Sequence, residues 1–213
     1  MLMTSLRLQT ADWHRRAERA VNFRARMSDR TRYMDFLRRL FGFYDPLETL
    51  LGEFLASEIS LQFEARRKSG LLALDLRHLG DSVTDVTRIL RCTGLPVIAS
   101  RATAFGALYV LEGATLGGQI LSRHLATHLG IDVSNGGAFL SSYGSAVRAM
   151  WSSFGEVIER CCDTAAKQEE ALEAAVQTFA SFASWFEHDR RVPSDCVSSQ
   201  SLARKDVRSE DVA

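Results

Sequence analysis

Apolar residues recur every three to four positions along most of the chain, a spacing that places them on one face of a helix. No stretch alternates apolar and polar residues as a half-buried strand does, and prolines occur only at positions 46, 96 and 193. Pro46 and Pro96 are expected to start helices, because proline is tolerated in the first helical turn. The spacing predicts an all-α fold of about eight helices. We expect these helices over residues 4–26, 28–44, 46–66, 71–80, 82–94, 96–129, 145–161 and 165–188.

The helical pattern stops near residue 190. Residues 190–213 contain too few apolar side chains to pack against a core, so we expect a disordered tail there. No repeat and no change in composition marks a second domain within residues 1–189. The sequence therefore predicts a single helical domain over residues 1–189, followed by a tail.

Composition and charge narrow the functional classes. The 26 basic residues equal the 26 acidic ones, so no overall charge attracts nucleic acid or a membrane surface. The most apolar run, around residues 104–111, is soon ended by Glu112 and falls short of the roughly 20 residues of a membrane span. The first residues lack the apolar core of a secretory signal, and the four cysteines show no metal-binding spacing. We expect a cytoplasmic protein without a nucleic-acid or membrane partner.

The segment AFGALYVLEGATLGGQIL, residues 104–121, combines a helical apolar pattern with four glycines. Each glycine inside a helix costs roughly 1 kcal/mol relative to alanine. Gly106, Gly113 and Gly117 lie within about 40° of one another on the helix surface, and Gly118 lies beside them. Close helix packing is one explanation of this spacing. The adjacent pair Gly117 and Gly118 favours the other, a helix that bends over a flat ligand.

A histidine with a carboxylate one turn later marks the first predicted helix. His14 and Glu18 are spaced i, i+4, which allows the carboxylate to orient the imidazole and raise its basicity as a metal ligand. Arg7 lies two turns earlier on the same side, roughly 10 Å along the axis, where it can meet a carboxylate on a large planar ligand. The alternative is an exposed histidine in a surface salt bridge.

Together, these two segments resemble the heme oxygenase family. The first helix of that family carries a basic residue, a threonine, the proximal histidine and a glutamate one turn later. The corresponding residues in this sequence are Arg7, Thr10, His14 and Glu18. Residues 106–121 are similar to the distal helix of bacterial members, particularly those that accompany bacteriophytochromes. Three shorter matches, which are weak alone, are DLRHLG at 75–80, FLSSYG at 139–144 and MW at 150–151.

The resemblance implies that heme lies between the first helix and the glycine-rich helix. His14 would bind the iron as a neutral imidazole, leaving the opposite position open to dioxygen. Backbone groups at Gly113 and Gly117 would take the catalytic role on that distal face, with ordered water between them and the bound oxygen. The remaining heme-binding residues that the resemblance implies are Arg7, Thr10, Glu18, Tyr109, Ala114, Gly118 and Arg148.

Two departures from the animal enzymes affect this interpretation. Ala114 occupies the place of an aspartate that organises distal water in those enzymes, although bacterial relatives also lack it. The basic residues that meet the heme propionates late in the animal sequence have no match around residues 152–156. Water must then be held another way, and Arg7, Tyr109 and Arg148 must contribute more to heme binding.

The activity implied is oxidation of heme to biliverdin, carbon monoxide and ferrous iron. No flavin- or nicotinamide-binding motif is present, so electrons would come from a ferredoxin, a flavodoxin or a reductase. A bacteriophytochrome is a candidate acceptor of the biliverdin. Residues 15–26 are basic, and form either a docking face for an acidic redox partner or an ordinary solvated helix face.

Three alternatives remain at this point. The chain could be a noncatalytic heme- or bilin-binding protein on the same scaffold. It could also be a helical protein that uses its glycines only for packing. Finally, His124 and His128 have the i, i+4 spacing of metal ligands, although no third ligand is apparent in the sequence.

Overall fold

The computed structural model describes residues 1–188, and within them it contains helices and loops but no strand. This confirms the all-α prediction, whereas the predicted tail at residues 190–213 lies outside the described residues. The helices are α1 (Leu2–Gln9), α2 (Ala11–Val21), α3 (Phe23–Arg26), α4 (Arg30–Leu55), α5 (Phe63–Arg66), α6 (Ser69–His78), α7 (Val83–Thr87), α8 (Arg101–Leu129), α9 (Ala138–Ser141), α10 (Val147–Cys161) and α11 (Ala165–Glu187). Short 3₁₀ turns cover Ile59–Leu61 and Gly144–Ala146.

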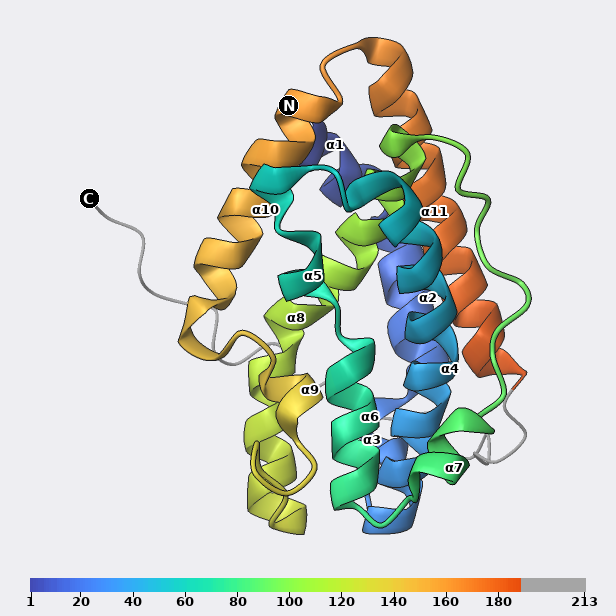
Figure 1. The fold of residues 1–213 in the computed structure, drawn as a ribbon, viewed down its shortest axis with the longest axis vertical. Coiled ribbons are helices and arrows are strands. Elements are labelled where there is room, and N and C mark those ends of the chain that lie inside the picture. Colours follow the sequence, from blue (N-terminus) through green and yellow to red (C-terminus); the bar gives the residue numbers. More distant parts are fainter. Residues whose placement is uncertain (189–213) are drawn as a thin grey trace.

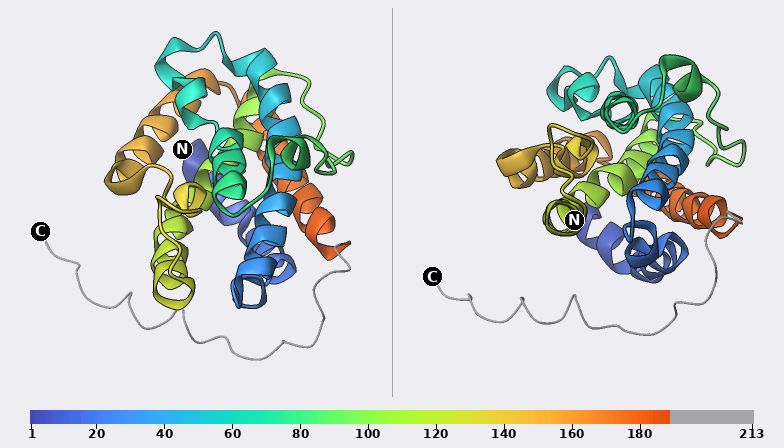
Figure 2. Two further views of the ribbon diagram at one scale, coloured as in Figure 1. Left: turned by 60° about the horizontal axis from the view of Figure 1, so that its bottom comes forward. Right: turned by 90° about the horizontal axis from the view of Figure 1, so that it is seen from below.

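The glycine-rich helix α8 lies at the centre of the fold (Figure 1). Its most extensive contacts are with α11, which also packs along α2, while α4 packs against α6 and α8. Seen from below, α8 and the α2–α3 segment lie on neighbouring sides of the molecule (Figure 2). Fully buried aromatic side chains fill the interior between these helices: Tyr33, Phe36, Phe43, Phe105, Phe154 and Phe186.

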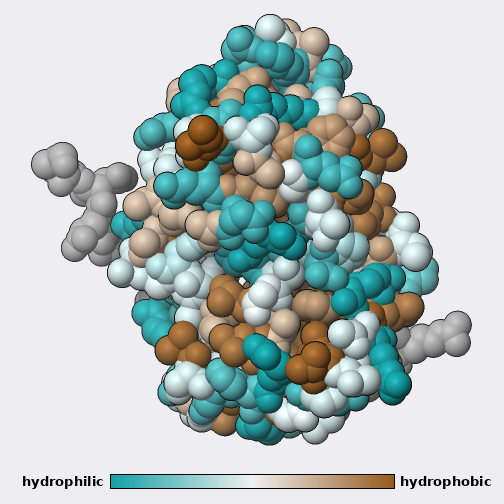
Figure 3. Space-filling model, in the orientation of Figure 1, coloured by the Kyte–Doolittle hydropathy of each residue, from teal (hydrophilic) through white to brown (hydrophobic). Residues whose placement is uncertain are grey.

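Apolar and polar residues are interspersed over the face drawn in Figure 3. Among residues 1–188, no helix combines the length and apolar character that a membrane span requires.

Proline 46 does not start a new helix, so the prediction of separate helices over 28–44 and 46–66 is wrong. Helix α4 continues through Pro46 to Leu55. A proline inside a helix has no N–H to donate to the carbonyl four residues earlier, here that of Gly42. The backbone N–H of Cys92 donates to that carbonyl instead, at 2.8 Å. A side chain at Gly42 would collide with the carbonyl of Leu90, so a glycine is needed for this close approach.

The first predicted helix, residues 4–26, is divided into α1, α2 and α3. Thr10 separates the first two, and its hydroxyl donates to the carbonyl of Leu6 at 2.7 Å. Asn22 separates the last two in a left-handed conformation, φ 48°, which asparagine tolerates better than most residues. Its side chain accepts a hydrogen bond from the N–H of Ala25 at the start of α3. Local breaks at Thr10 and Asn22 thus divide a periodic segment that the sequence pattern predicts as continuous.

The glycine-rich helix starts at Arg101 rather than at Pro96. Ser100 and Thr103 form a capping box, in which the Ser100 side chain accepts from the N–H of Thr103 at 3.1 Å. The Thr103 hydroxyl in turn accepts from the N–H of Ser100 at 2.9 Å. These reciprocal bonds satisfy donors that a helix start leaves free, and they determine where α8 begins.

The predicted helix over residues 82–94 is shorter than expected, because only Val83–Thr87 is helical. The chain that follows runs as a loop to Ser100 and includes the contact of Cys92 with α4.

Candidate functional site

Two of the four glycines in α8 serve close helix packing. A Cβ atom at Gly106 would collide with the backbone of Ala171 in α11. A Cβ atom at Gly118 would lie 2.5 Å from the carbonyl oxygen of Leu140 in α9. The structure therefore corrects the interpretation of Gly117 and Gly118 as one feature, because Gly118 is buried against α9.

The other two glycines leave the helix backbone uncovered. A Cβ atom at Gly117 would have no neighbour within 4 Å, and one at Gly113 would make only an ordinary contact of 3.8 Å with Trp151. Leu116 and Ile120, on the same stretch of α8, are 43% and 66% exposed. We call this part of α8, formed by Gly113, Leu116, Gly117 and Ile120, the bare face.

The helix α8 meets the N-terminal segment at one end of the bare face. The phenol of Tyr109 lies near the buried side chain of Thr10 and within reach of the charge of Arg7. Burial raises the pKa of the Tyr109 phenol, while the Thr10 contact and the Arg7 charge oppose that rise. The ring of Tyr109 also packs against that of Trp151, with centroids 5.6 Å apart. Three predicted heme-binding residues from two separate helices therefore lie together.

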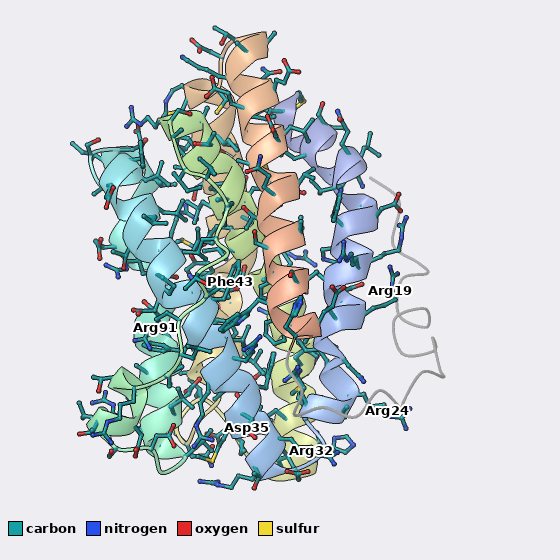
Figure 4. All side chains as sticks on the ribbon, turned by 90° about the vertical axis from the view of Figure 1, so that its right-hand side faces the viewer. Arg19, Arg24, Arg32, Asp35, Phe43 and Arg91 are labelled. Atoms are coloured by element: carbon teal, nitrogen blue, oxygen red, sulfur yellow. The ribbon has the colours of Figure 1, made fainter. Side chains whose placement is uncertain are left out.

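The same two segments approach each other again at the far end of the bare face. Burial lowers the pKa of His124, and the charges of His128 and Arg24 lower it further. Arg24, which is labelled in Figure 4, belongs to α3, so its effect on His124 shows that α3 lies within electrostatic range of the C-terminal part of α8. The polar groups of Thr10 and Arg24 thus influence Tyr109 and His124 in the same order along both segments. The fifteen residues from Tyr109 to His124 correspond to about 22 Å of helix.

His14 lies on α2 between these two contacts. Its side chain is 55% exposed, and its Nδ1 atom is 3.7 Å from Oε2 of Glu18, within ion-pair range but longer than a hydrogen bond. The imidazole meets the ring of Phe179 in α11 edge-on, at 5.8 Å between centroids. His14 comes one turn after Thr10, just as Gly113 comes one turn after Tyr109. The imidazole and the bare face therefore occupy the same level of the two helices.

The remaining predicted residues lie at the edge of this arrangement. Arg148 is exposed in the first turn of α10, one turn before Trp151. Ala114 is exposed on α8 beside Gly113.

The three weak motifs of the sequence surround α8. Asp75 accepts hydrogen bonds from the N–H groups of Ala138 and Phe139, both at 2.8 Å, and so anchors α9 against Gly118. The ring of Trp151 lies beside Gly113, where an added Cβ atom would be 3.8 Å from it. These segments therefore support the glycine-rich helix from two sides.

A buried ionic cluster behind α8 was not predicted from the sequence. Glu112 is 1% exposed and forms an ion pair with Arg66, whose Nη1 atom lies 2.5 Å from Oε2 of Glu112. The hydroxyl of Tyr143 donates to the other carboxylate oxygen of Glu112 at 2.6 Å. Glu48 accepts from the backbone N–H of Lys68 at 2.6 Å, and burial raises the pKa of the Glu48 carboxyl. The sequence does contain a signal for this cluster, because Glu112 lies inside the most apolar part of a helix. A charged side chain in such a place is rarely buried without a partner.

The two histidines at the end of α8 pack against each other. The rings of His124 and His128 stack with centroids 3.9 Å apart. Within residues 1–188, no group of three or more histidine, cysteine, aspartate or glutamate side chains is placed to bind a metal ion.

Comparison with known proteins identifies the family of this chain. The sequence matches the family described as Heme oxygenase over residues 1–188. A protein of Xanthomonas campestris pv. campestris named heme oxygenase is 29% identical over 157 residues, which cover 72% of this chain and 88% of that protein.

Solved structures show the same fold. The Neisseria meningitidis heme oxygenase, solved with NO and CO bound, superposes with a TM-score of 0.77 at 20% identity, covering 95% of this chain and 98% of that one. The Leptospira interrogans heme oxygenase superposes with a TM-score of 0.67 at 19% identity, covering 87% and 98%. Since the family match extends over the whole described part of the sequence, the chain belongs to the heme oxygenase family.

Proposed function

We propose that this enzyme binds heme between α2 and α8, with His14 as the iron ligand, and releases biliverdin, carbon monoxide and ferrous iron. Membership of the family makes the protein a heme-degrading enzyme and favours this activity over noncatalytic heme or bilin binding. One observation carries the site assignment. An exposed imidazole and an uncovered helix backbone occupy the same level of two helical segments whose charges and polar groups influence each other at both ends.

The side chains present fit a heme group. A neutral imidazole is a common axial ligand of heme iron, and His14 is exposed rather than committed to the core. Leu116 and Ile120 offer exposed apolar surface, whose burial against the ring would contribute about 25 cal/mol per Å². Gly113 and Gly117 present no side chain that would occupy the space above the ring. The pure packing explanation of the glycines therefore fails for these two positions.

Each remaining residue has a role toward the bound group. When bound, heme supplies the redox chemistry, and the protein orients it. Glu18 restrains the His14 imidazole from its own helix, while Arg7 and Arg148 offer charges for the propionates. Tyr109 and Thr10 lie near each other at one end of the site, where α8 approaches the N-terminal segment.

Electrons must reach the site from another protein, and we propose that they enter beside α2 and α3. Arg15, Arg19 and Arg24 are exposed on these helices, and two of them are labelled in Figure 4. This charge favours an acidic donor such as a ferredoxin, a flavodoxin or a reductase. The resemblance to enzymes that accompany bacteriophytochromes supports such a protein as acceptor of the biliverdin. Free thiols at Cys92, Cys161 and Cys162 support action in the cytoplasm.

A titration of the purified protein with hemin tests the proposal. We expect a Soret band at one equivalent, and its conversion to a biliverdin spectrum when ascorbate or reduced ferredoxin is supplied under air. A band that persists under these conditions would support the noncatalytic binding protein instead. The absence of any Soret band would contradict a heme site, and chromatography of the product identifies the biliverdin isomer.

A further inference from the structure

One buried arginine joins three helices. Arg66 is the last residue of α5, a short helix that lies beside α8 and α10 (Figure 1). Its side chain is 2% exposed, and its guanidinium forms an ion pair with Glu112 of α8. The same guanidinium donates to the backbone carbonyl of Met150 at 3.1 Å and to the hydroxyl of Ser153 at 2.8 Å, both in α10. A planar guanidinium holds its acceptors in a fixed fork, so Arg66 fixes the position of α10 relative to α8.

The residues that directly follow two of these contacts meet at the bare face. Gly113 comes after Glu112, and Trp151 comes after Met150. Successive residues of a helix point about 100° apart, so Gly113 points in a different direction from the ionic cluster. A Cβ atom at Gly113 would lie 3.8 Å from the ring of Trp151. The place of the Trp151 ring beside the bare face therefore depends on how Arg66 holds α8 and α10 together.

Aromatic packing connects Trp151 to the same arginine. The centroid of the Trp151 ring is 5.6 Å from that of Tyr109 in α8 and 5.8 Å from that of Phe154 in α10. The guanidinium of Arg66 lies 5.9 Å from the centroid of the Phe154 ring. Closely packed side chains have low compressibility and transmit a displacement to their neighbours. A shift of α10 at its contacts with Arg66 is therefore expected to move Trp151 relative to α8.

We propose that Arg66 is a positioning residue, which keeps the ring of Trp151 beside Gly113, and that this ring limits how heme turns within its site. The second part of this proposal rests on the heme oxygenase function proposed above. Trp151 presents a rigid edge at the α10 side of the bare face, so a heme group turned toward α10 would collide with it. The orientation of the heme ring determines which of its bridging carbons is oxidised. Arg66 thereby influences which biliverdin isomer is released, although it lies behind α8.

The variant Arg66→Lys tests the first part in the protein without heme. Lysine keeps the positive charge opposite Glu112 but replaces the fork by a compact ammonium. Incorporation of 5-fluorotryptophan gives one fluorine NMR signal for each of the three tryptophans, and Trp151→Phe identifies the signal of Trp151. We expect Arg66→Lys to shift that signal and to leave those of Trp13 in α2 and Trp185 in α11 in place. An unchanged Trp151 signal, or equal shifts of all three, would overturn the proposal.

Arg67→Lys is the matched control, because Arg67 is adjacent in the chain but its ion pairs are elsewhere. They join it to Glu48 of α4 at 3.8 Å and to Glu64 of α5 at 3.5 Å. This variant should keep all three fluorine signals in place. If thermal unfolding shows that Arg66→Lys does not fold, Ser153→Ala replaces it. That variant removes one contact between Arg66 and α10 and keeps the ion pair behind α8, so an unchanged Trp151 signal would again refute the proposal.

The isomers of biliverdin test the second part. Hemin titration establishes that each variant is loaded, and chromatography after turnover with ascorbate measures the ratio of isomers. This ratio should change several-fold in Trp151→Ala, which removes the edge, and in Arg66→Lys, which displaces it. Arg67→Lys should keep the ratio of the unmodified enzyme. A merely structural role of Arg66 would lower the melting temperature of Arg66→Lys and leave the ratio unchanged.

The outcomes of these experiments separate this proposal from the proposed function. If the unmodified protein takes up no heme, the proposed function fails, and the fluorine spectra still decide whether Arg66 positions Trp151. If Arg66→Lys moves the Trp151 signal but keeps the isomer ratio, the effect on heme orientation is refuted while the heme site stands. If Trp151→Ala changes the ratio and Arg66→Lys changes neither the signal nor the ratio, the role of Arg66 is refuted.

Discussion

The two sides of helix α8 differ in nearly every physical respect. On one side, Gly113 and Gly117 leave the backbone uncovered, on the face proposed to meet heme. On the other, Glu112 is fully buried against Arg66 and Tyr143, and Gly118 lies close against the backbone of α9. Residues of one type, glycine, therefore serve close packing on one side and an open site on the other. The packed and ionic side holds α8 in place, which allows its other side to remain open without collapsing.

Replacing His14 by Ala should have the largest effect on the open side. The variant loses the proposed iron ligand but keeps the apolar surface around it, so it should still take up heme with an altered Soret band. Turnover to biliverdin should be lost almost completely, and added imidazole should partly restore the spectrum. Hemin titration followed by an ascorbate assay measures both properties. Normal turnover with an unchanged spectrum would show that His14 is not the ligand.

Replacing Glu112 by Gln tests the packed side. The substitution keeps the shape but removes a negative charge that faces Arg66 and Lys68 within the buried cluster. Breaking a buried ion pair costs about 3–5 kcal/mol, so urea unfolding should show a loss of that size. The surface variant Glu64→Gln is the matched control, because Glu64 is exposed and its ion pair with Arg67 is weak. A loss below about 1 kcal/mol would mean that the cluster does not stabilise α8.

A matched pair of leucine substitutions compares the two kinds of glycine directly. Gly106→Leu must displace the backbone at Ala171 and should destabilise the fold by about 1–3 kcal/mol or more. Gly117→Leu has open space around it and should leave stability unchanged or slightly higher, because leucine is the better helix former. Its side chain would occupy the bare face, so turnover should fall sharply. Equal stability of the two variants, or normal turnover of Gly117→Leu, would contradict the division into a packing glycine and a glycine of the bare face.

Arg7→Glu should weaken heme binding by about 1–3 kcal/mol, the value of a charged hydrogen bond. It should also alter the ratio of biliverdin isomers, because the propionate contacts determine how the ring is rotated in its site. Competition with apomyoglobin measures the affinity, and chromatography measures the isomers. The assignment of Arg7 to a propionate would be abandoned if both quantities were unchanged.

Glu18→Ala should have the smallest effect. The carboxylate lies 3.7 Å from Nδ1 of His14 and both side chains are more than half exposed, so it restrains the ligand only loosely. We expect a decrease on the order of 10-fold in turnover, as for other residues that orient a metal ligand. Glu18→Gln, which can still orient the ring, should recover part of that loss. A decrease as large as that of His14→Ala would assign Glu18 a more direct role.

The local helix signals in the sequence predicted much of the fold. The start of α11 and the extents of α6 and α10 agree closely with the predicted segments, because their apolar spacing and their ends point to the same structure. Pro46 was misleading, since the prediction allowed for the missing N–H but not for Cys92, which donates to Gly42 in its place. Residues 190–213 lie outside the described residues, so the expected tail stays a prediction.

For the site, the sequence by itself determined the chemical parts: an imidazole with a carboxylate one turn later, and a helix with glycines at helical spacing. Spacing along one helix follows from its fixed geometry, so such patterns are readable without a structure. Only the tertiary structure decided which glycines are buried and which are bare, because that depends on where α9 and α11 pass. It also decided that Glu112, Arg66 and Lys68 meet behind α8. Contacts between distant segments depend on how the helices pack, and the spacing within any one helix carries no information about them.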